Sequence, residues 1–175
     1  MSLHLVRHGR PLPRPGVPAR QWELDPSGFD DVWALRESGR LPSGAAWFCS
    51  PEPKAMSTAQ LLTEGEVGVV EDLREHERES TEWIEDFAGT VERAFAQPDV
   101  AAYAGWEPLA RCRDRVVRAV TGILEVHRGE DVVLVGHGTA WTVLVAALTG
   151  QAPDLRRWRA LATPDLIVVD EAALG

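Results

Sequence analysis

The sequence predicts an α/β protein, a three-layer α/β/α sandwich with a mostly parallel, mixed central sheet. Short runs rich in β-branched residues alternate with longer segments in which apolar residues recur at helical spacing. The short runs are almost continuously apolar, as expected for strands that helices cover on both faces. The chain has 175 residues, 45% of them hydrophobic, which is enough for one sizeable core. We therefore expect a single domain over residues 1–175.

Five apolar runs are expected to form the sheet. They cover residues 3–6, 46–49, 67–70, 132–135 and 166–169. Four segments between them carry helical spacing and are expected to form the outer layers. They cover residues 27–40, 53–62, 106–127 and 139–148. The third of these segments has apolar residues at intervals of three, four or seven, which indicates an amphipathic helix, whereas the fourth is short and apolar throughout.

Two segments interrupt this alternation. Residues 11–18, PLPRPGVP, hold four prolines and a glycine, and are expected to form a loop. Residues 74–86, REHERESTEWIED, are densely charged and only weakly periodic. Ligands of open α/β sheets bind beyond the carboxyl ends of the strands, and both segments follow a strand, so each is expected to overhang a site. Trp22, which follows the first segment, and Trp83, within the second, could each stack on the organic part of a substrate, but we expect both to pack against the protein.

Composition and charge exclude several classes of protein. Eighteen Lys and Arg face 27 Asp and Glu, and the net charge of -9 argues against nucleic acid or an anionic membrane as the main partner. No signal peptide and no membrane span is recognisable near the N-terminus, so we expect a cytoplasmic protein. Cys49 and Cys112 are too few for a disulfide framework, and we expect both to be reduced and buried.

Basic, acidic and imidazole side chains follow the ends of four predicted strands. The first strand runs into Arg-His-Gly, and the fourth ends in a second His-Gly that leads into a helix. The second is followed by a lysine in the first turn of a helix, and the third by a glutamate in the charged segment. Together the strand ends supply Arg7, His8, Lys54, Glu75 and His137. Since the carboxyl ends of parallel strands share one edge of a sheet, we expect a common site.

These motifs resemble those of the histidine phosphatase superfamily, also called phosphoglycerate mutase-like. LVRHGR is similar to the family's RHG signature at the end of the first strand, and SPEPKAMSTA to its SP…RA…TA segment after the second. LREH resembles the segment that carries the family's acid, and VGHG its second histidine motif. The order of the motifs also agrees and spans nearly the whole chain. The resemblance implies a phosphoglycerate mutase-like fold.

The resemblance further implies a metal-independent phosphomonoesterase that acts on a small phosphate ester through a phosphohistidine intermediate. His8 would be the nucleophile, which requires an unprotonated attacking nitrogen. Glu75 would protonate the leaving oxygen, with Glu77 as the rival, and a carboxyl group can do so near neutral pH only if its pKa is raised. No cofactor is implied, and no metal-ligand spacing is present in the sequence.

Phosphoryl transfer spreads negative charge over the phosphoryl oxygens, so cations and backbone N–H groups are expected to bind them. By the resemblance, Arg7, Lys54 and the second catalytic histidine, His137, would supply the cations. Gly138 and Thr139 would add backbone N–H groups at the start of their helix, where an anion is favoured.

The sequence departs from the family at Lys54, where the family has an arginine whose planar fork lysine cannot reproduce. This motivates an alternative, a phosphate-ester binding protein with little or no turnover. A phosphohistidine protein phosphatase and a mutase are further alternatives. The expected partner is a small-molecule phosphate ester, and the loops that bear Trp and Pro leave a homodimer open.

Overall fold

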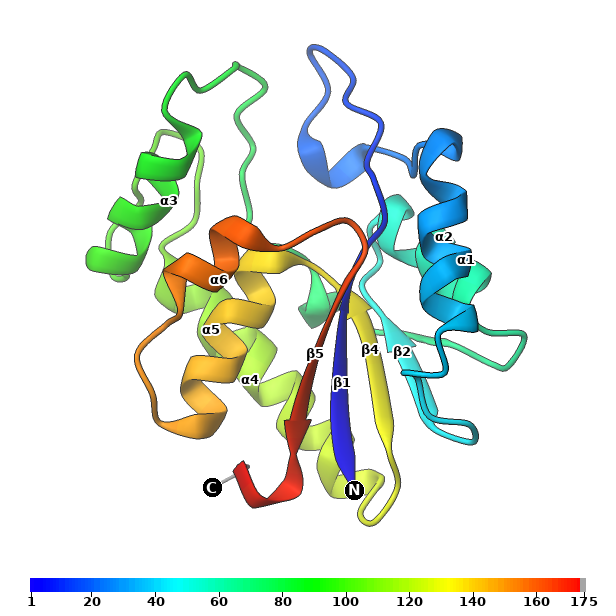
Figure 1. The fold of residues 1–175 in the computed structure, drawn as a ribbon. Helices are drawn as coiled ribbons and strands as arrows, with labels where there is room; N and C mark the ends of the chain where they lie inside the picture. The colour runs from blue at the N-terminus through cyan, green and yellow to red at the C-terminus, as the bar shows by residue number, and fades with distance from the viewer. Residues whose placement is uncertain (174–175) are drawn as a thin grey trace.

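The central sheet has five strands in the order β3-β2-β4-β1-β5 in the computed structural model, which describes residues 1–173 (Figure 1). The strands are β1 (Ser2–Arg7), β2 (Ala46–Cys49), β3 (Gly68–Val69), β4 (Val132–Gly136) and β5 (Asp165–Asp170). The first four pair in parallel, and β5 runs antiparallel to β1. The predicted mixed, mostly parallel sheet is confirmed, although β3 has only two residues.

Helices cover both faces of this sheet. They are α1 (Phe29–Glu37), α2 (Pro53–Leu62), α3 (Phe87–Ala96), α4 (Leu109–Val126), α5 (Gly138–Thr149) and α6 (Leu155–Ala160). Side chains of a strand alternate between its faces, so Leu3 and Leu5 of β1 pack in the core under α4 and α5, whereas Val6 packs under α1 and α2. The predicted three-layer sandwich is therefore confirmed.

Three of the predicted helices differ from the structure at their starts or ends. The helix expected over residues 27–40 begins as a 3₁₀ turn, Pro26–Gly28, and α1 itself ends at Glu37. The helix expected over residues 106–127 starts only at Leu109, because Pro108 precedes it as N-cap, and Trp106 is buried in the preceding loop. The helix expected over residues 139–148 extends by one residue at each end, as α5.

Two helices, α3 and α6, are absent from the sequence prediction. Each begins after an aspartate whose side chain accepts a backbone N–H of the first turn, Asp86 from Gly89 and Asp154 from Arg157. An aspartate N-cap is a signal that the sequence contains. It was hidden at Asp86 by the run of charges before it, and at Asp154 by the shortness of the six-residue helix.

The two interrupting segments lie above the carboxyl ends of the parallel strands, at the top of Figure 1, as expected. Arg20 of the first loop forms an ion pair with Glu79 of the second, at 3.0 Å, which joins the two segments. Trp22 donates its indole N–H to the carbonyl of Val17 and packs within its own loop. The expectation that Trp83 packs is wrong, because this side chain is 88% exposed at the tip of the charged segment.

The cysteines are free and buried, as predicted, and burial raises the pKa of the Cys49 thiol to about 11. Within residues 1–173, none of the helices is long and apolar enough to cross a membrane.

Candidate active site

The two His-Gly motifs meet at the upper edge of the sheet. His8 follows β1 and His137 follows β4, and these strands are parallel neighbours with Arg7 opposite Gly136. The two imidazole rings pack edge to face with their centroids 5.2 Å apart. Both residues are buried, with exposed fractions of 6% and 0%. The structure therefore brings together the two histidines that the strand ends predicted.

The glycine after His8 is required by close packing. A Cβ atom at Gly9 would lie 2.8 Å from a methyl group of Val32 and 2.9 Å from one of Leu24. The absence of a side chain lets β1 turn into its loop against α1, while the Gly9 N–H donates to the hydroxyl of Thr58 on α2. The carbonyl of Gly9 is thereby fixed beside the His8 ring.

That carbonyl sets the tautomer of His8. Nδ1 of His8 lies 2.6 Å from the Gly9 oxygen, and a carbonyl only accepts, so Nδ1 carries the proton. Nε2 is left with a lone pair when the ring is neutral. Burial, reinforced by the neighbouring His137 and Lys54, lowers the pKa of His8 well below 6.5. His8 is therefore neutral near pH 7 and has one nitrogen ready for nucleophilic attack.

His137 is held by Ser50 at the end of β2, a residue that the sequence analysis did not single out. Its Nε2 lies 2.7 Å from the Ser50 hydroxyl and 3.4 Å from a carboxylate oxygen of Glu52, whereas its buried Nδ1 has no protein partner in the described chain. Burial lowers the pKa of His137 to about 3. His137 is therefore neutral near pH 7 in the free protein, and Nδ1 is the ring nitrogen left to contact a ligand.

The carboxylate of Glu75 sits against the N-terminus of α5. It accepts the backbone N–H of Ala140 at 2.8 Å, that of Thr139 at 3.1 Å and that of His76 at 2.9 Å. Burial disfavours its charged form, but Arg78 and these N–H groups outweigh burial and lower the pKa of Glu75 to about 2.

One expectation is corrected by this arrangement. The backbone N–H of Thr139 binds the Glu75 carboxylate and is therefore not free for a phosphate, and the predicted donor pair with Gly138 is not open. Instead Gly138 provides space, because a Cβ atom there would lie 3.4 Å from Nε of Arg7. The site without a ligand does not raise the pKa of Glu75, so a bound anion has to provide the raised pKa that a general acid needs.

Glu77, the rival acid, points elsewhere. It pairs with Arg74 at 2.5 Å, and its side chain is 38% exposed. The geometry therefore favours Glu75, which lies beside the α5 turn that follows His137, over Glu77.

A buried arginine on α4 holds the Glu75 segment in place. The guanidinium of Arg115 donates to the carbonyls of Asp72, Arg74 and Glu75 at 3.2, 2.7 and 2.7 Å, and to the carboxylate of Glu107 at 2.6 Å. Arg115 is only 6% exposed. One side chain thus fixes the backbone on both sides of the candidate acid, and the sequence analysis missed it.

Lys54 reaches the site but already has partners. Its ammonium lies 2.5 Å from the Glu52 carboxylate and donates to the carbonyl of Ala19 at 2.7 Å. Both side chains of the ion pair are 6% exposed. The other Glu52 oxygen accepts the backbone N–H of Glu75 at 2.8 Å. The lysine therefore belongs to a buried network that ties α2 to the Glu75 segment.

Two arginines complete the site. Arg7 donates through one terminal nitrogen to the carbonyl of Leu161 at 2.5 Å, and Arg78 donates to the hydroxyl of Thr139 at 3.0 Å. In both side chains Nε is buried and has no partner in the described part of the protein. Arg7 was predicted, whereas Arg78 was not, because it comes from the loop rather than from a strand end.

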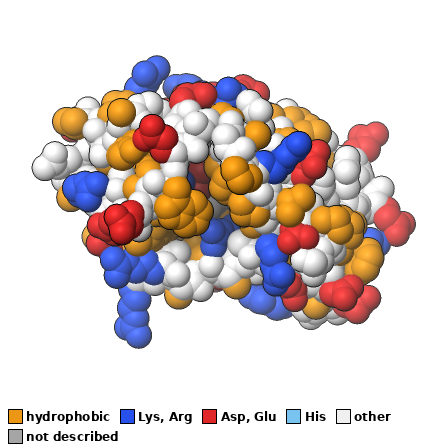
Figure 2. Space-filling model, turned by 90° about the horizontal axis from the view of Figure 1, so that it is seen from above, with side chains coloured by type: hydrophobic (Ala, Val, Ile, Leu, Met, Phe, Trp, Pro, Cys, Tyr) orange, Lys and Arg blue, Asp and Glu red, His pale blue; other side chains and the backbone are white. Residues whose placement is uncertain are grey.

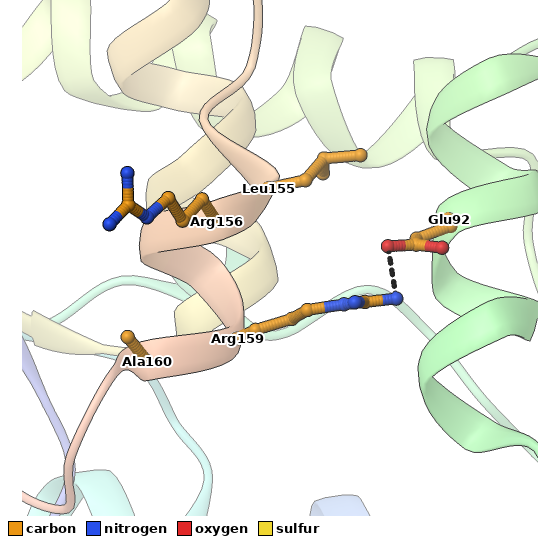
Figure 3. Close-up of a pocket in the computed structure, with 5 residues that line it drawn as sticks. All are labelled: Glu92, Leu155, Arg156, Arg159 and Ala160. Atoms are coloured by element: carbon orange, nitrogen blue, oxygen red, sulfur yellow. Dashed lines mark ion pairs between the residues drawn. The ribbon is translucent and has the colours of Figure 1, made fainter.

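The face above the sheet is hollowed near its centre, with charged groups inside and hydrophobic side chains on the rim (Figure 2). A separate cavity of about 400 Å³ lies between α3 and α6, where Arg159 pairs with Glu92 (Figure 3). None of the residues contacted by His8, His137, Glu75 or Lys54 lines this cavity, and the candidate site is therefore the cluster around the two histidines.

The comparisons with known proteins agree with this geometry. The family model described as "Histidine phosphatase superfamily (branch 1)" matches residues 3–172. No curated protein sequence matches the chain.

Solved structures of the same fold include three that illustrate the range of relatives. YhfR of Bacillus stearothermophilus has a TM-score of 0.76 at 23% identity, with 97% of this chain and 90% of that chain covered. A mycobacterial glucosyl-3-phosphoglycerate phosphatase has a TM-score of 0.73 at 21% identity, with 98% and 92% covered. A phosphoserine phosphatase mutant from Entamoeba histolytica in complex with phosphoserine has a TM-score of 0.70 at 16% identity, with 95% and 89% covered. Identities this low establish the fold alone.

Proposed function

The chain belongs to branch 1 of the histidine phosphatase superfamily, and we propose that it is a metal-independent phosphomonoesterase that works through a phosphohistidine. The observation that carries the proposal is His8, whose Nδ1 proton is fixed on the Gly9 carbonyl while its lowered pKa keeps Nε2 unprotonated. A buried, oriented and neutral imidazole is the form that nucleophilic catalysis requires.

In the first step, Nε2 of His8 attacks phosphorus as the bond from phosphorus to the ester oxygen breaks. Arg7 stabilises the charge that spreads over the phosphoryl oxygens, and Nδ1 of His137, which is buried without a protein partner among the described residues, is available to contact one of them. The leaving oxygen takes a proton from Glu75, and the alcohol departs. The phosphoryl group is then bonded to His8.

In the second step, water attacks the phosphohistidine. Glu75, now a carboxylate, accepts a proton from the water as the P–N bond breaks, and inorganic phosphate leaves. Glu75 starts with a pKa of about 2, so it carries no proton in the free protein near pH 7. A monoanionic phosphate ester brings that proton, since the second pKa of a phosphate is about 6 and the bound dianion raises the pKa of the adjacent carboxyl group.

We propose a small monophosphate whose remainder is neutral or cationic. The charged segment that overhangs the site presents four exposed carboxylates, on Glu79, Glu82, Glu85 and Asp86, which would repel a polyanionic substrate, although Glu79 is paired with Arg20. The names of two structural relatives mention small phosphate compounds, glucosyl-3-phosphoglycerate and phosphoserine, which agrees with a small substrate. Preference for bisphosphates or inositol polyphosphates in a substrate screen would overturn this substrate class.

The test is phosphate release from para-nitrophenyl phosphate and from a panel of small monophosphates, with and without chelator. We expect the wild type to release phosphate in chelator, and His8→Ala to release none and to form no acid-labile phosphoprotein. Activity that is lost in chelator, or that survives in His8→Ala, would contradict the mechanism.

A second candidate, a phosphate-ester binding protein without turnover, is favoured by one observation. Lys54, which stands where the family has arginine, is paired with Glu52. This candidate predicts that the wild type binds phosphate esters but releases no phosphate from any of them, and that Lys54→Arg does not change this.

A further inference from the structure

The buried pair of Glu52 and Lys54 leaves little positive charge for a phosphate at the position of the family's arginine. Two of the three Lys54 N–H donors bind the Glu52 carboxylate and the Ala19 carbonyl. Turning the ammonium toward a phosphate would leave Glu52 without a counter-ion at 5% exposure, which is strongly unfavourable. Another cation is therefore needed to bind the phosphoryl group.

Arg78 has the geometry for that task. Its guanidinium carbon lies 4.9 Å from the centre of the Phe87 ring and 4.7 Å from that of Trp106, and these two rings contact each other edge to face, so the fork packs against an aromatic pair. One terminal nitrogen donates to Thr139, and the buried Nε has no hydrogen-bond partner in the described part of the chain. Within residues 1–173, Arg78 forms no ion pair closer than 4.0 Å, in contrast to Lys54.

Arg78 also lies on the catalytic side of its segment. The hydroxyl that it contacts belongs to Thr139, two residues after His137. The backbone N–H of Thr139 donates to the Glu75 carboxylate. Arg7 packs over Gly138 in the same turn, and its Nε is likewise buried without a hydrogen-bond partner among residues 1–173. Two guanidinium groups with unused N–H donors therefore border one turn, and each interacts electrostatically with the Glu75 carboxylate. Such like charges favour binding of an anion with two negative charges.

We propose that Arg78 is the second arginine that binds the phosphoryl group, and that Lys54 is a structural cation held by Glu52. This inference rests on the proposed function in assigning the ligand as a phosphoryl group. Arg78 then supplies the planar two-pronged donor that the sequence lacks at position 54. Arg78 and Arg7 together then bind the phosphoryl oxygens, a role for which Arg7, Lys54 and His137 were predicted.

The test is calorimetric titration with inorganic phosphate, which needs no turnover, together with kcat and KM for para-nitrophenyl phosphate. Arg78→Met is expected to weaken phosphate binding about 10- to 100-fold, the loss expected for one or two hydrogen bonds to a charged group. Arg78→Lys keeps the charge but not the fork, and is expected to recover only part of the binding. Arg74→Met is the matched control, because Arg74 lies on the same segment but pairs with Glu77 and Asp72 outside the site.

The lysine is tested by replacing the whole ion pair. The double variant Glu52→Gln with Lys54→Met removes both buried charges at similar volume, and circular dichroism and thermal unfolding verify that it folds. Its phosphate affinity is expected to stay within about threefold of the wild type. If the folded double variant loses phosphate binding while Arg78→Met keeps it, the proposal is wrong. If phosphate binding depends on Arg78 but no ester is hydrolysed by the wild type, the phosphatase fails and the Arg78 site stands.

Discussion

Arg115 offers the sharpest test of how the candidate acid is held in place. Arg115→Ala removes a guanidinium that is 6% exposed and that donates four hydrogen bonds, one of them to the Glu107 carboxylate. Glu107 would remain buried without its counter-ion, since its side chain is only 6% exposed. Removing one partner of a buried ion pair costs about 3–5 kcal/mol, so we expect the free energy of unfolding to fall by that amount.

The assay is urea unfolding followed by tryptophan fluorescence, since Trp106 and Trp141 are buried reporters. Arg118→Ala is the control on the same helix, because Arg118 pairs with Asp72 but its side chain is 70% exposed. An exposed pair contributes about 0–1 kcal/mol, so this control should change little. A loss below about 1 kcal/mol in Arg115→Ala, equal to that of the control, would refute the assignment of Arg115 as the residue that fixes the Glu75 segment.

Two further predictions concern the acid and the first motif. Glu75→Gln should lower kcat/KM for an alkyl monophosphate about 10²- to 10⁴-fold, but kcat/KM for para-nitrophenyl phosphate far less, because kcat/KM reports the first step and a phenolate leaves without a proton. For the alkyl ester, the wild-type kcat/KM should be flat below about pH 6 and fall above it, as the monoanion that carries the proton to Glu75 disappears. If the pH at which kcat/KM falls stays the same for esters of different phosphate pKa, the proton comes from a group of the enzyme and this prediction is wrong. Gly9→Ala should destabilise by about 1–3 kcal/mol in urea unfolding, because the methyl group would meet Val32 and Leu24. Gly122→Ala, on α4 with open space around it, should instead be neutral or stabilising, and equal effects at the two glycines would contradict the packing argument.

The positions of the two histidines could be predicted because they depend on a simple rule. β1 and β4 are recognisable as apolar runs, and the carboxyl ends of parallel strands lie at one edge of the sheet. His8 and His137 follow those ends directly, so their meeting requires no knowledge of loop conformation. The mostly parallel, mixed direction of the strands likewise agrees with the prediction, whereas their order was not predicted.

The residues that support the histidines could not be predicted in the same way. Ser50, Glu52 and Arg78 act through side chains whose direction is decided by loop and cap conformations. Arg115 had a signal, a charged residue within the amphipathic pattern of α4 that is buried rather than exposed. Its partners, however, are mostly backbone carbonyls of a distant segment, which no sequence pattern specifies.

Glu52 illustrates why the charge of a site cannot be read from its cations alone. Pro53 begins α2, which leaves Glu52 as an extended N-cap whose carboxylate makes no capping hydrogen bond and is therefore free to bind Lys54 and the Glu75 segment. The effect of lysine in place of the family's arginine on phosphate binding thus cannot be judged without Glu52, since an arginine at position 54 would lie beside the same buried carboxylate. Which cations beside the histidines can bind a phosphate depends on which charged residues pair with one another in the folded chain. Lys54 is paired with Glu52, whereas Arg78 forms no ion pair within 4.0 Å among residues 1–173. Arg78 is therefore the better candidate for binding the phosphoryl group, although the order of the motifs points to Lys54.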